Sequence, residues 1–222
     1  MRAPRFIDSG EDYALCSWLE GSPLGNKDLS ESEKKELAKR MGSGLAEIHE
    51  IKFESFGEIG PDGIEEFDSW PDFVENLIGW MRSEAEKDVV QNALDYLEEN
   101  IEVMDHDPEP VLLHGDFHDG NILSGEKLGV VDCEAGFIGT REYEVFRCLS
   151  HWAEEWGVEE EFLDVYGREK LANNWRKKKS YYEILQAAMG VIDGVNLGSG
   201  HLVEINEEGL KEALPSRYLS SG

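Results

Sequence analysis

Apolar residues recur at helical spacing in the stretch that follows residue 30. The recurring residues are Leu37, Met41, Leu45 and Ile48. Steps of three to four positions place them on one face of a helix, and Ser30 and Glu33 have the spacing of a capping box at its start. The same periodicity predicts two more helices, at about 69–82 and 84–104.

Short apolar runs of strand length follow these helices. Residues 111–113, 121–123 and about 128–132 are predicted strands, and the two prolines of segment 105–110 end the helix before them. Near the beginning of the chain, residues 11–20 are apolar and aromatic enough for a strand that enters a hinge, and the Gly-Ser-Pro sequence that follows ends it.

Helical periodicity returns after the last of these strands. It predicts helices at about 142–156, 159–166 and 173–196, and then a tail at 204–222 with one weak helix and a frayed end. Long helices around a few short strands indicate an α+β protein whose strands flank one loop.

That loop, residues 114–121, has the sequence His-Gly-Asp-Phe-His-Asp-Gly-Asn. The spacing H-x-D-x-x-x-x-N places Asp116 where a carboxylate accepts the proton of a substrate hydroxyl, and Asn121 where an amide oxygen holds a metal ion. Asn121 also suits a turn, but its distance from Asp116 favours the metal role. Asp132 ends the next strand and supplies a second hard oxygen ligand of the kind that Mg²⁺ prefers. The pattern predicts a phosphoryl-transfer site.

Imidazoles and carboxylates two residues apart within this loop also suggest an alternative, a zinc-dependent hydrolase. A catalytic zinc needs three protein ligands, at least one of them from elsewhere in the chain. The other histidines sit in no matching motif, so this is the weaker interpretation. They are His49, His106, His151 and His201.

The loop motif, the hinge-like segment 13–24, the helix ending at His49 and the segment Gly139–Val145 together resemble aminoglycoside phosphotransferases and choline kinases. The resemblance runs from about Pro4 into the last third of the chain. It implies a protein-kinase-like C-terminal lobe, mostly helical, with short strands around the catalytic loop. It also implies ATP and Mg²⁺ as cofactors and a small molecule with a hydroxyl group, such as an aminoglycoside or a choline-like alcohol, as the acceptor.

The resemblance assigns individual roles as well. It makes Asp116 the catalytic residue, Asn121 and Asp132 the metal ligands, and the backbone of Ser17, Trp18 and Leu19 the adenine contact. His114 matches a residue that fixes the loop by hydrogen bonds to its backbone. Glu134 matches a second carboxylate near the metal, although a solvated loop acid fits its position equally well. Glu144 stands where the family has an Asp that braces the catalytic loop, and its side chain is longer.

Family members carry a glycine-rich loop, a phosphate-binding Lys and its Glu partner ahead of the hinge, and these do not precede it here. Residues 1–24 are therefore expected to be a small-lobe remnant with the hinge, and 25–222 the helical catalytic lobe. A segment ahead of Met1 would complete the small lobe. The alternative is a non-catalytic or truncated kinase-like binding module. For residues 1–222 alone we expect Mg·ATP binding weaker than millimolar and negligible turnover, because exposed charge pairs contribute little compared with a dry phosphate clamp.

Composition narrows the partners. The formal charge of −27, from 48 acidic and 21 basic residues, disfavours nucleic acid and anionic membranes. Acidic residues dispersed over a folded chain suggest a halophilic protein in a high-salt cytoplasm. The alternative is an ordinary acidic mesophilic protein. An acidic cleft would favour a cationic acceptor. Cys16, Cys133 and Cys148 form no CxxC and are expected to be small core residues in a reducing compartment.

Overall fold

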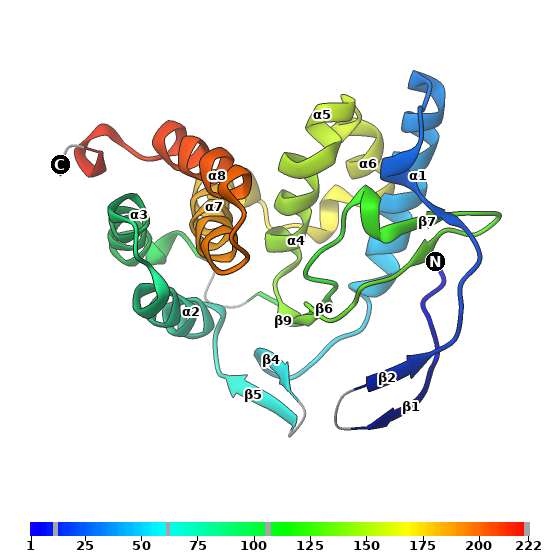
Figure 1. Ribbon diagram of the computed structural model, residues 1–222, viewed down its shortest axis with the longest axis horizontal. Coiled ribbons are helices and arrows are strands. Elements are labelled where there is room, and N and C mark those ends of the chain that lie inside the picture. Colours follow the sequence, from blue (N-terminus) through cyan, green and yellow to red (C-terminus); the bar gives the residue numbers. More distant parts are fainter. Residues whose placement is uncertain (11–12, 61–62, 105–107, 220–222) are drawn as a thin grey trace. The chain divides into compact units, whose positions relative to one another are not determined.

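The structure is a computed structural model whose chain divides into two compact units (Figure 1). Unit 1 comprises residues 1–54, 58–64 and 110–171, and unit 2 comprises residues 55–57, 65–109 and 172–222. The residues that the structure describes are 1–10, 13–60, 63–104 and 108–219. Segments of the chain's beginning and middle thus form unit 1, which contains the loop 114–121.

Helix α1, Glu31–Ile48, begins at the predicted capping box in unit 1. The Ser30 hydroxyl accepts the N–H of Glu33, and the Glu33 carboxylate accepts the N–H of Ser30 at 2.9 Å. Its apolar face, which includes the buried Met41 and Leu45, packs against α6, Glu159–Tyr166. The predicted helix is confirmed because capping and periodicity agree on its start and its buried face.

Two sets of short antiparallel strands flank the loop 114–121. The first set is β3 (Ser22–Pro23), β7 (Ile122–Ser124) and β8 (Gly129–Val130), with β7 in the middle. In the second, β6 (Val111–Leu113) pairs with β9 (Phe137–Gly139). The predicted strands at 111–113 and 121–123 are confirmed within one residue, the one at 128–132 is shorter than expected, and β9 was not predicted.

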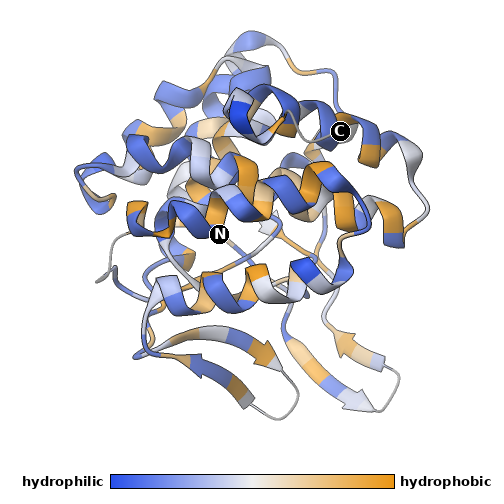
Figure 2. Ribbon diagram, turned by 90° about the vertical axis from the view of Figure 1, so that its left-hand side faces the viewer, coloured by the Kyte–Doolittle hydropathy of each residue, from blue (hydrophilic) through white to orange (hydrophobic). Residues whose placement is uncertain are grey.

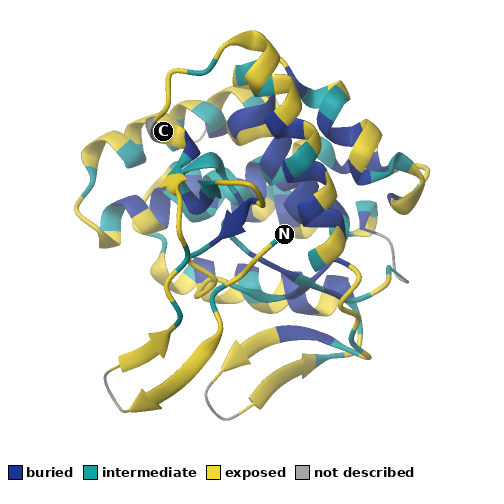
Figure 3. Ribbon diagram, turned by 90° about the vertical axis from the view of Figure 1, so that its right-hand side faces the viewer, coloured by how far each residue is buried: buried dark blue, intermediate teal, exposed yellow. Residues whose placement is uncertain are grey.

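A β-hairpin precedes the β3 strand. Strands β1 (Phe6–Gly10) and β2 (Tyr13–Cys16) pair with each other, and every residue of both is exposed (Figure 3). The strand predicted at 11–20 corresponds to β2, but its first two positions lie outside the described residues.

The helical part of unit 1 continues after β9. Helix α4 (Arg141–Cys148) runs without a break into a π-helix, η4 (Leu149–Ala153), and a last turn, α5 (Glu154–Trp156). Three 3₁₀ turns complete the unit: η1 (Leu24–Asn26), η3 (Asp119–Asn121) and η5 (Arg168–Lys170). The prediction of a helix at 142–156 is confirmed, while its π-helical middle was not foreseen. Helix α6 has the predicted bounds.

Unit 2 is built from amphipathic helices. They are α2 (Trp70–Glu84), α3 (Asp88–Glu99), α7 (Lys179–Asn196) and α8 (Gly200–Ala213), with 3₁₀ turns η2 (Ile101–Val103), η6 (Trp175–Lys178) and η7 (Ser216–Tyr218). Figure 2 shows hydrophilic and hydrophobic residues alternating along them. Inside the unit, the Trp70 indole donates to the Tyr182 hydroxyl at 3.1 Å. The buried indole N–H of Trp70 is thereby satisfied.

Several expectations need correction. Helix α8 begins at Gly200, capped by Ser199, and packs along α7, so the tail is a full helix rather than a weak one from residue 204. The hairpin of β4 (Phe56–Gly60) and β5 (Gly63–Phe67) was not predicted, and its residues are divided between the two units. Segment 105–107, which includes His106, and residues 220–222, where a frayed end was expected, lie outside the described residues.

Of the three cysteines, only Cys148 is buried. The prediction of core positions is wrong for Cys16 and Cys133, which are exposed because β2 has no covering layer and Cys133 lies on the loop after β8. Among the residues that the structure describes, no helix combines the length and the apolar character needed to cross a membrane.

Candidate active site

The loop 114–121, here called the HGD loop, is fastened to α4 by the carboxylate of Glu144. This side chain is fully buried. Its Oε2 accepts the backbone N–H of His114 at 3.0 Å, and its Oε1 accepts the N–H of Gly115 at 2.6 Å. Both oxygens therefore serve the loop, and the length of a Glu side chain is sufficient to reach it from the first turn of α4.

Glycine is required at position 115. Its φ of +80° lies in the left-handed region, and a Cβ there would stand 1.9 Å from the carbonyl oxygen of Ala135. Any other residue would be strained and would collide with backbone. The tight approach explains how two N–H groups of the loop can face one carboxylate.

A second buried pair supports Glu144 from behind. The Nε2 atom of His49, at the end of α1, lies 2.9 Å from Glu144 Oε2, and its Nδ1 lies 2.7 Å from the Tyr166 hydroxyl. The Glu144 carboxylate accepts each of its hydrogen bonds, so His49 donates from Nε2, and in the neutral ring Nδ1 then accepts from the Tyr166 hydroxyl. Burial raises the pKa of Tyr166. Tyr166 thus donates to His49, and His49 donates to Glu144. These two hydrogen bonds tie α6 and α1 to the HGD loop.

The His114 ring fixes the other side of the loop. Its Nε2 donates to the Val131 carbonyl at 3.0 Å, while its Nδ1 accepts the N–H of Asp116 at 3.3 Å. Both ring nitrogens are engaged by backbone, which leaves neither for a metal ion. Among the described residues no group of three or more His, Cys, Asp or Glu side chains is placed to hold a metal, so the zinc hydrolase alternative finds no support.

The Asp116 carboxylate has three side-chain partners. Oδ1 accepts from Arg147 Nη2 at 2.8 Å, and Oδ2 accepts from Asn121 Nδ2 at 2.9 Å and lies 3.2 Å from His118 Nε2. The hydrogen bond from His118 and the ion pair with Arg147 hold the pKa of Asp116 well below its usual range. Asp116 is therefore a fixed, ionised group of low basicity, better suited to orient a hydroxyl than to deprotonate it early.

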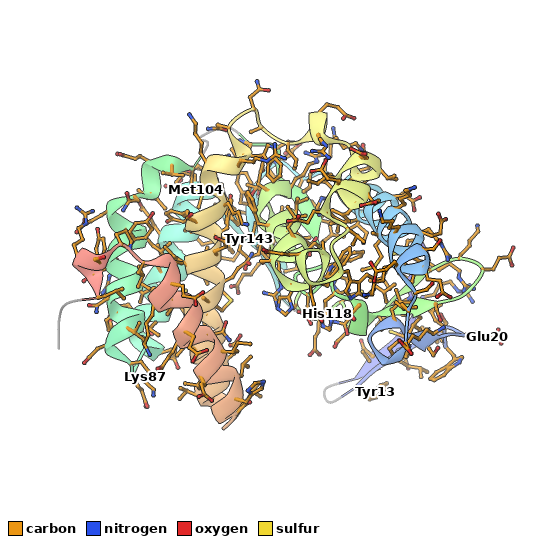
Figure 4. All side chains as sticks on the ribbon, turned by 90° about the horizontal axis from the view of Figure 1, so that it is seen from above. Tyr13, Glu20, Lys87, Met104, His118 and Tyr143 are labelled. Carbon is orange, nitrogen blue, oxygen red and sulfur yellow. The ribbon has the colours of Figure 1, made fainter. Side chains whose placement is uncertain are left out.

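His118 connects two carboxylates. Its Nδ1 lies 3.7 Å from Asp119 Oδ1, opposite the Nε2 contact with Asp116. The interactions with the carboxylates of Asp116 and Asp119, of which that with Asp116 is the larger, raise the pKa of His118 to about 9. Nδ1 also accepts the N–H of Gly120 at 3.0 Å, a bond that only the neutral ring makes. Protonation thus exchanges this bond for a stronger charge interaction with the two carboxylates, and His118 lies near the edge of its unit (Figure 4).

The predicted metal ligands lie at one end of the β7–β8 ladder. Ile122 pairs with Val130, and the N–H of Val131 donates to the Asn121 carbonyl at 3.0 Å, so Asn121 and Asp132 flank the same end of the sheet. Both hydrogens of the Asn121 amide point to Asp116, at its Oδ2 and its main-chain oxygen. Its Oδ1, which accepts no hydrogen bond from the described residues, is the atom left for a cation.

Asp132 has a strained backbone. Its φ of +64° makes it the one non-glycine residue with a positive φ in the described part of the chain. Left-handed conformations cost about 1 kcal/mol or more outside glycine and concentrate at functional sites. Glu134, two residues later, is exposed in a turn, with no partner among the described residues to fix it.

The hinge-like residues adjoin the same sheet. Pro23 of β3 pairs with Leu123 of β7. Leu19 packs against Gly129 of β8, where its Cδ1 lies 3.2 Å from the point that a Cβ at this position would occupy. Trp18 is 87% exposed. Ser17 already donates its N–H to the Arg5 carbonyl at 2.8 Å and accepts the Arg5 N–H at its Oγ at 2.8 Å. Ser17 thus has no free N–H for an adenine edge, whereas Trp18 and Leu19 remain available.

A cavity of about 360 Å³ in unit 1 lies elsewhere, between the end of α1 and the residues around the end of α6. Glu47, Asp164 and Lys170 are among its lining residues, and no residue of the HGD loop is. This cavity is therefore not part of the candidate active site, which the HGD loop forms.

Sequence reasoning missed four participants. His49 was set aside as a histidine without a motif, and Tyr166, Arg147 and His118 were given no role in this arrangement. One signal was available for Arg147, because it lies one helical turn after Glu144 and so shares its face of α4. His49 and Tyr166 reach the loop only through tertiary packing, and His118 is a residue of the loop itself.

Comparison with known proteins bears on the family and the fold of the chain. Residues 1–181 match the model of the phosphotransferase enzyme family. The solved structure of a thermostable mutant of aminoglycoside phosphotransferase APH(4)-Ia, in ternary complex with AMP-PNP and hygromycin B, is similar at 21% identity and a TM-score of 0.72, covering 99% of this chain and 78% of that one. No curated protein sequence matches the chain.

Two further structures share the fold. The gentamicin complex of APH(2")-IIa is 17% identical with a TM-score of 0.67, covering 98% of this chain and 76% of that one. An ethanolamine kinase of Plasmodium vivax is 15% identical with a TM-score of 0.65, covering 99% and 69% respectively. The chain belongs to the phosphotransferase enzyme family, and the predicted resemblance and α+β, protein-kinase-like fold class are confirmed.

Proposed function

We propose that this protein is a small-molecule kinase, which transfers the γ-phosphate of ATP to a hydroxyl group of a small acceptor. The observation that carries the proposal is the arrangement around Asp116. Its carboxylate is fixed by Arg147, Asn121 and His118, while Asn121 and Asp132, both with side-chain oxygen atoms, flank the adjoining end of β7 and β8. A fixed carboxylate beside two hard oxygen ligands suits in-line phosphoryl transfer.

Asp116 has the central role in this proposal. Its carboxylate accepts a hydrogen bond from the acceptor hydroxyl and aligns that oxygen with the phosphorus. Because the pKa of Asp116 is held low, the proton passes to it only as the new O–P bond forms and the bond to the leaving ADP oxygen breaks. Such positioning accounts for most of the catalysis in a loose, dissociative transition state.

Asn121 and Asp132 fit a Mg²⁺ ion by the chemistry of their donors. An amide oxygen and a carboxylate are hard ligands, and Mg²⁺ usually takes only one or two protein ligands together with water and substrate phosphates. When bound, Mg·ATP supplies the phosphoryl group and the charge neutralisation. Glu134, exposed in its turn, is at most an outer carboxylate of this site.

The remaining assignments follow from position. Residues 1–24 serve as a small-lobe segment with the hinge, in which the backbone of Trp18 and Leu19 contacts the adenine, and residues 25–222 form the catalytic lobe. His114 and Glu144 hold the HGD loop in shape. The names of the similar structures include AMP-PNP, hygromycin B and gentamicin, which supports ATP as donor and a small polar molecule as acceptor.

Incubating the purified chain with Mg·[γ-³²P]ATP and a panel of sugars, aminoglycosides and small alcohols tests the proposal. Because Mg·ATP binding by residues 1–222 is expected to be weaker than millimolar and turnover very low, we expect label to appear only slowly, and at Mg·ATP concentrations above millimolar, in at least one acceptor. Removal of Mg²⁺ by chelation should abolish this transfer. Nucleotide binding without transfer to any acceptor would favour a non-catalytic binding module instead, and release of inorganic phosphate alone would point to a hydrolase.

A further inference from the structure

Four alternating charges form a compact cluster around the HGD loop. Arg147 Nη2 lies 2.8 Å from Asp116 Oδ1, His118 Nε2 lies 3.2 Å from Asp116 Oδ2, and His118 Nδ1 lies 3.7 Å from Asp119 Oδ1. Each carboxylate of the cluster therefore has at least one nitrogen-bearing partner at 3.7 Å or less, and Arg147 is the permanent cation among them. The side chains are 24–32% exposed, so the pairs are only partly screened by water.

Arg147, the guanidinium of this cluster, lies on a defined face of a helix. Glu144, Arg147 and His151 stand at positions i, i+3 and i+7 of α4 and the π-helix η4 that continues it. They meet the HGD loop in order: Glu144 at Gly115, Arg147 at Asp116, and the His151 ring stacked on His118 with centroids 6.1 Å apart. His151 lies in the π-helix η4, and π-helical turns recur at functional sites. Arg147 is therefore built into the site.

We propose that Arg147 makes the acceptor site selective for uncharged alcohols, such as the hydroxyls of sugars and polyols, over acceptors that carry an ammonium group. This inference rests on the proposed kinase function and specifies its substrate class.

The physical reason is that no carboxylate of the cluster is left unpaired. A site that binds an ammonium needs an anionic partner for it, but Asp116 already has a guanidinium on one oxygen and an imidazole and an amide on the other. Arginine cannot release its proton to make room, and a second cation beside it is repelled. A neutral hydroxyl only has to share one lone pair of Asp116.

The global charge of −27 does not overturn this local balance. Charges separated by more than about 10 Å are largely screened at moderate salt, whereas Arg147 acts at hydrogen-bond distance. The composition alone favours a cationic acceptor, and the neighbours of Asp116 favour an uncharged one. The nearer charges decide specificity at the reacting oxygen.

A binding experiment tests the proposal without requiring turnover. The His118 imidazole resonances, identified by their loss in His118→Gln, are followed in the wild-type chain and in Arg147→Gln while methylammonium chloride is added at constant ionic strength. We expect no saturable shift in the wild type up to about 100 mM, and binding at least about 10-fold tighter in Arg147→Gln. Saturable binding of equal strength in both, or none in either, overturns the proposal.

Turnover supplies the second arm, with D-glucose and D-glucosamine as a matched pair at pH 7. The preference for glucose in kcat/KM is expected to fall about 10-fold or more in Arg147→Gln, and to persist in Arg147→Lys, which keeps the charge, and in Arg168→Gln, which changes a surface ion pair. A wild-type preference for glucosamine overturns the inference but leaves the kinase function standing.

The variant His118→Gln keeps the test open if Arg147→Gln does not fold. It retains a polar group near Asp116 while Arg147 stays in place, so the preference for glucose over glucosamine should persist, and its loss in this variant would overturn the assignment to Arg147. If neither sugar is phosphorylated while methylammonium is excluded as expected, the proposed function fails for these acceptors and the charge selectivity remains.

Discussion

The buried carboxylate of Glu144 accepts the backbone N–H of Gly115 at 2.6 Å, and Gly115 is the most constrained residue of the HGD loop. The same carboxylate accepts the N–H of His114 and the Nε2–H of His49. One side chain thus holds together the end of α1, the first turn of α4 and the loop that carries Asp116.

Replacing Glu144 with Gln should destabilise the fold, although the side chain keeps its shape. The amide has one acceptor oxygen, and its NH₂ group would face donors, leaving at least one buried N–H without a partner. We expect a loss of about 2–4 kcal/mol in the free energy of unfolding and a lower kcat. Urea denaturation measures the first, with exposed Glu155→Gln as the control. A change below about 0.5 kcal/mol would show that the loop is held otherwise.

Two glycines with positive φ give a matched pair. Gly115 combines a φ of +80° with a backbone oxygen 1.9 Å from where a Cβ would stand, whereas Gly157, with a φ of +66°, has open space around it. Gly157→Ala should cost about 1 kcal/mol from its backbone conformation alone. Gly115→Ala should cost several times that amount and reduce activity, because the loop must move. Equal melting temperatures for the two variants would contradict this account.

Asp132→Gly should separate stability from function. Glycine adopts a φ of +64° without strain, so the variant is expected to be more stable by a few tenths to about 1 kcal/mol, while Mg²⁺-dependent activity falls sharply. Thermal unfolding without metal gives the first quantity and steady-state kinetics the second. A destabilised variant would mean that the aspartate side chain, and not the metal role, explains the strained backbone.

The pH dependence of His118 follows from its two carboxylate neighbours. Its pKa of about 9 in the folded chain lies above the usual value of 6.5. Protonation therefore stabilises the fold fully below about pH 6.5, and the contribution is lost as the pH rises through 9. Since the ring is about one-third exposed, we expect a loss of only about 1–2 kcal/mol.

Unfolding experiments at pH 6 and pH 9.5, in the wild type and in His118→Gln, isolate this contribution. The difference between the two proteins should shrink at the higher pH. An NMR titration that finds the His118 pKa at or below 6.5 would instead show that the hydrogen bond from Gly120 to Nδ1 outweighs the carboxylates.

The sequence predicted those parts of the fold that local patterns determine. Helix α1 carries both a capping box and a clear apolar face, and α6 lies between glycine-containing turns, so their bounds were found. Helix α8 was underestimated because only Leu210 of it is buried, and its stability comes from packing along α7. The β4–β5 hairpin has mostly exposed residues and therefore little apolar alternation to detect.

The site shows the same division between local and tertiary information. The spacing of Asp116, Asn121 and Asp132 was visible because these residues lie close together in the chain. Arg147 lies 31 residues from Asp116, and His49 lies 95 residues from Glu144. No local pattern links such pairs, and only the packing of α1 and α4 on the HGD loop brings them into contact.

The most direct test of the central claim is the rate of phosphoryl transfer from Mg·ATP to one accepted alcohol by wild type, Asp116→Asn and the surface control Asp164→Asn. Asparagine keeps the size of Asp116 but removes its charge and its ability to take the proton. The account predicts a kcat lower by about 10²-fold or more for Asp116→Asn and an unchanged rate for Asp164→Asn. Asp116→Asn transferring phosphate at the wild-type rate would contradict it.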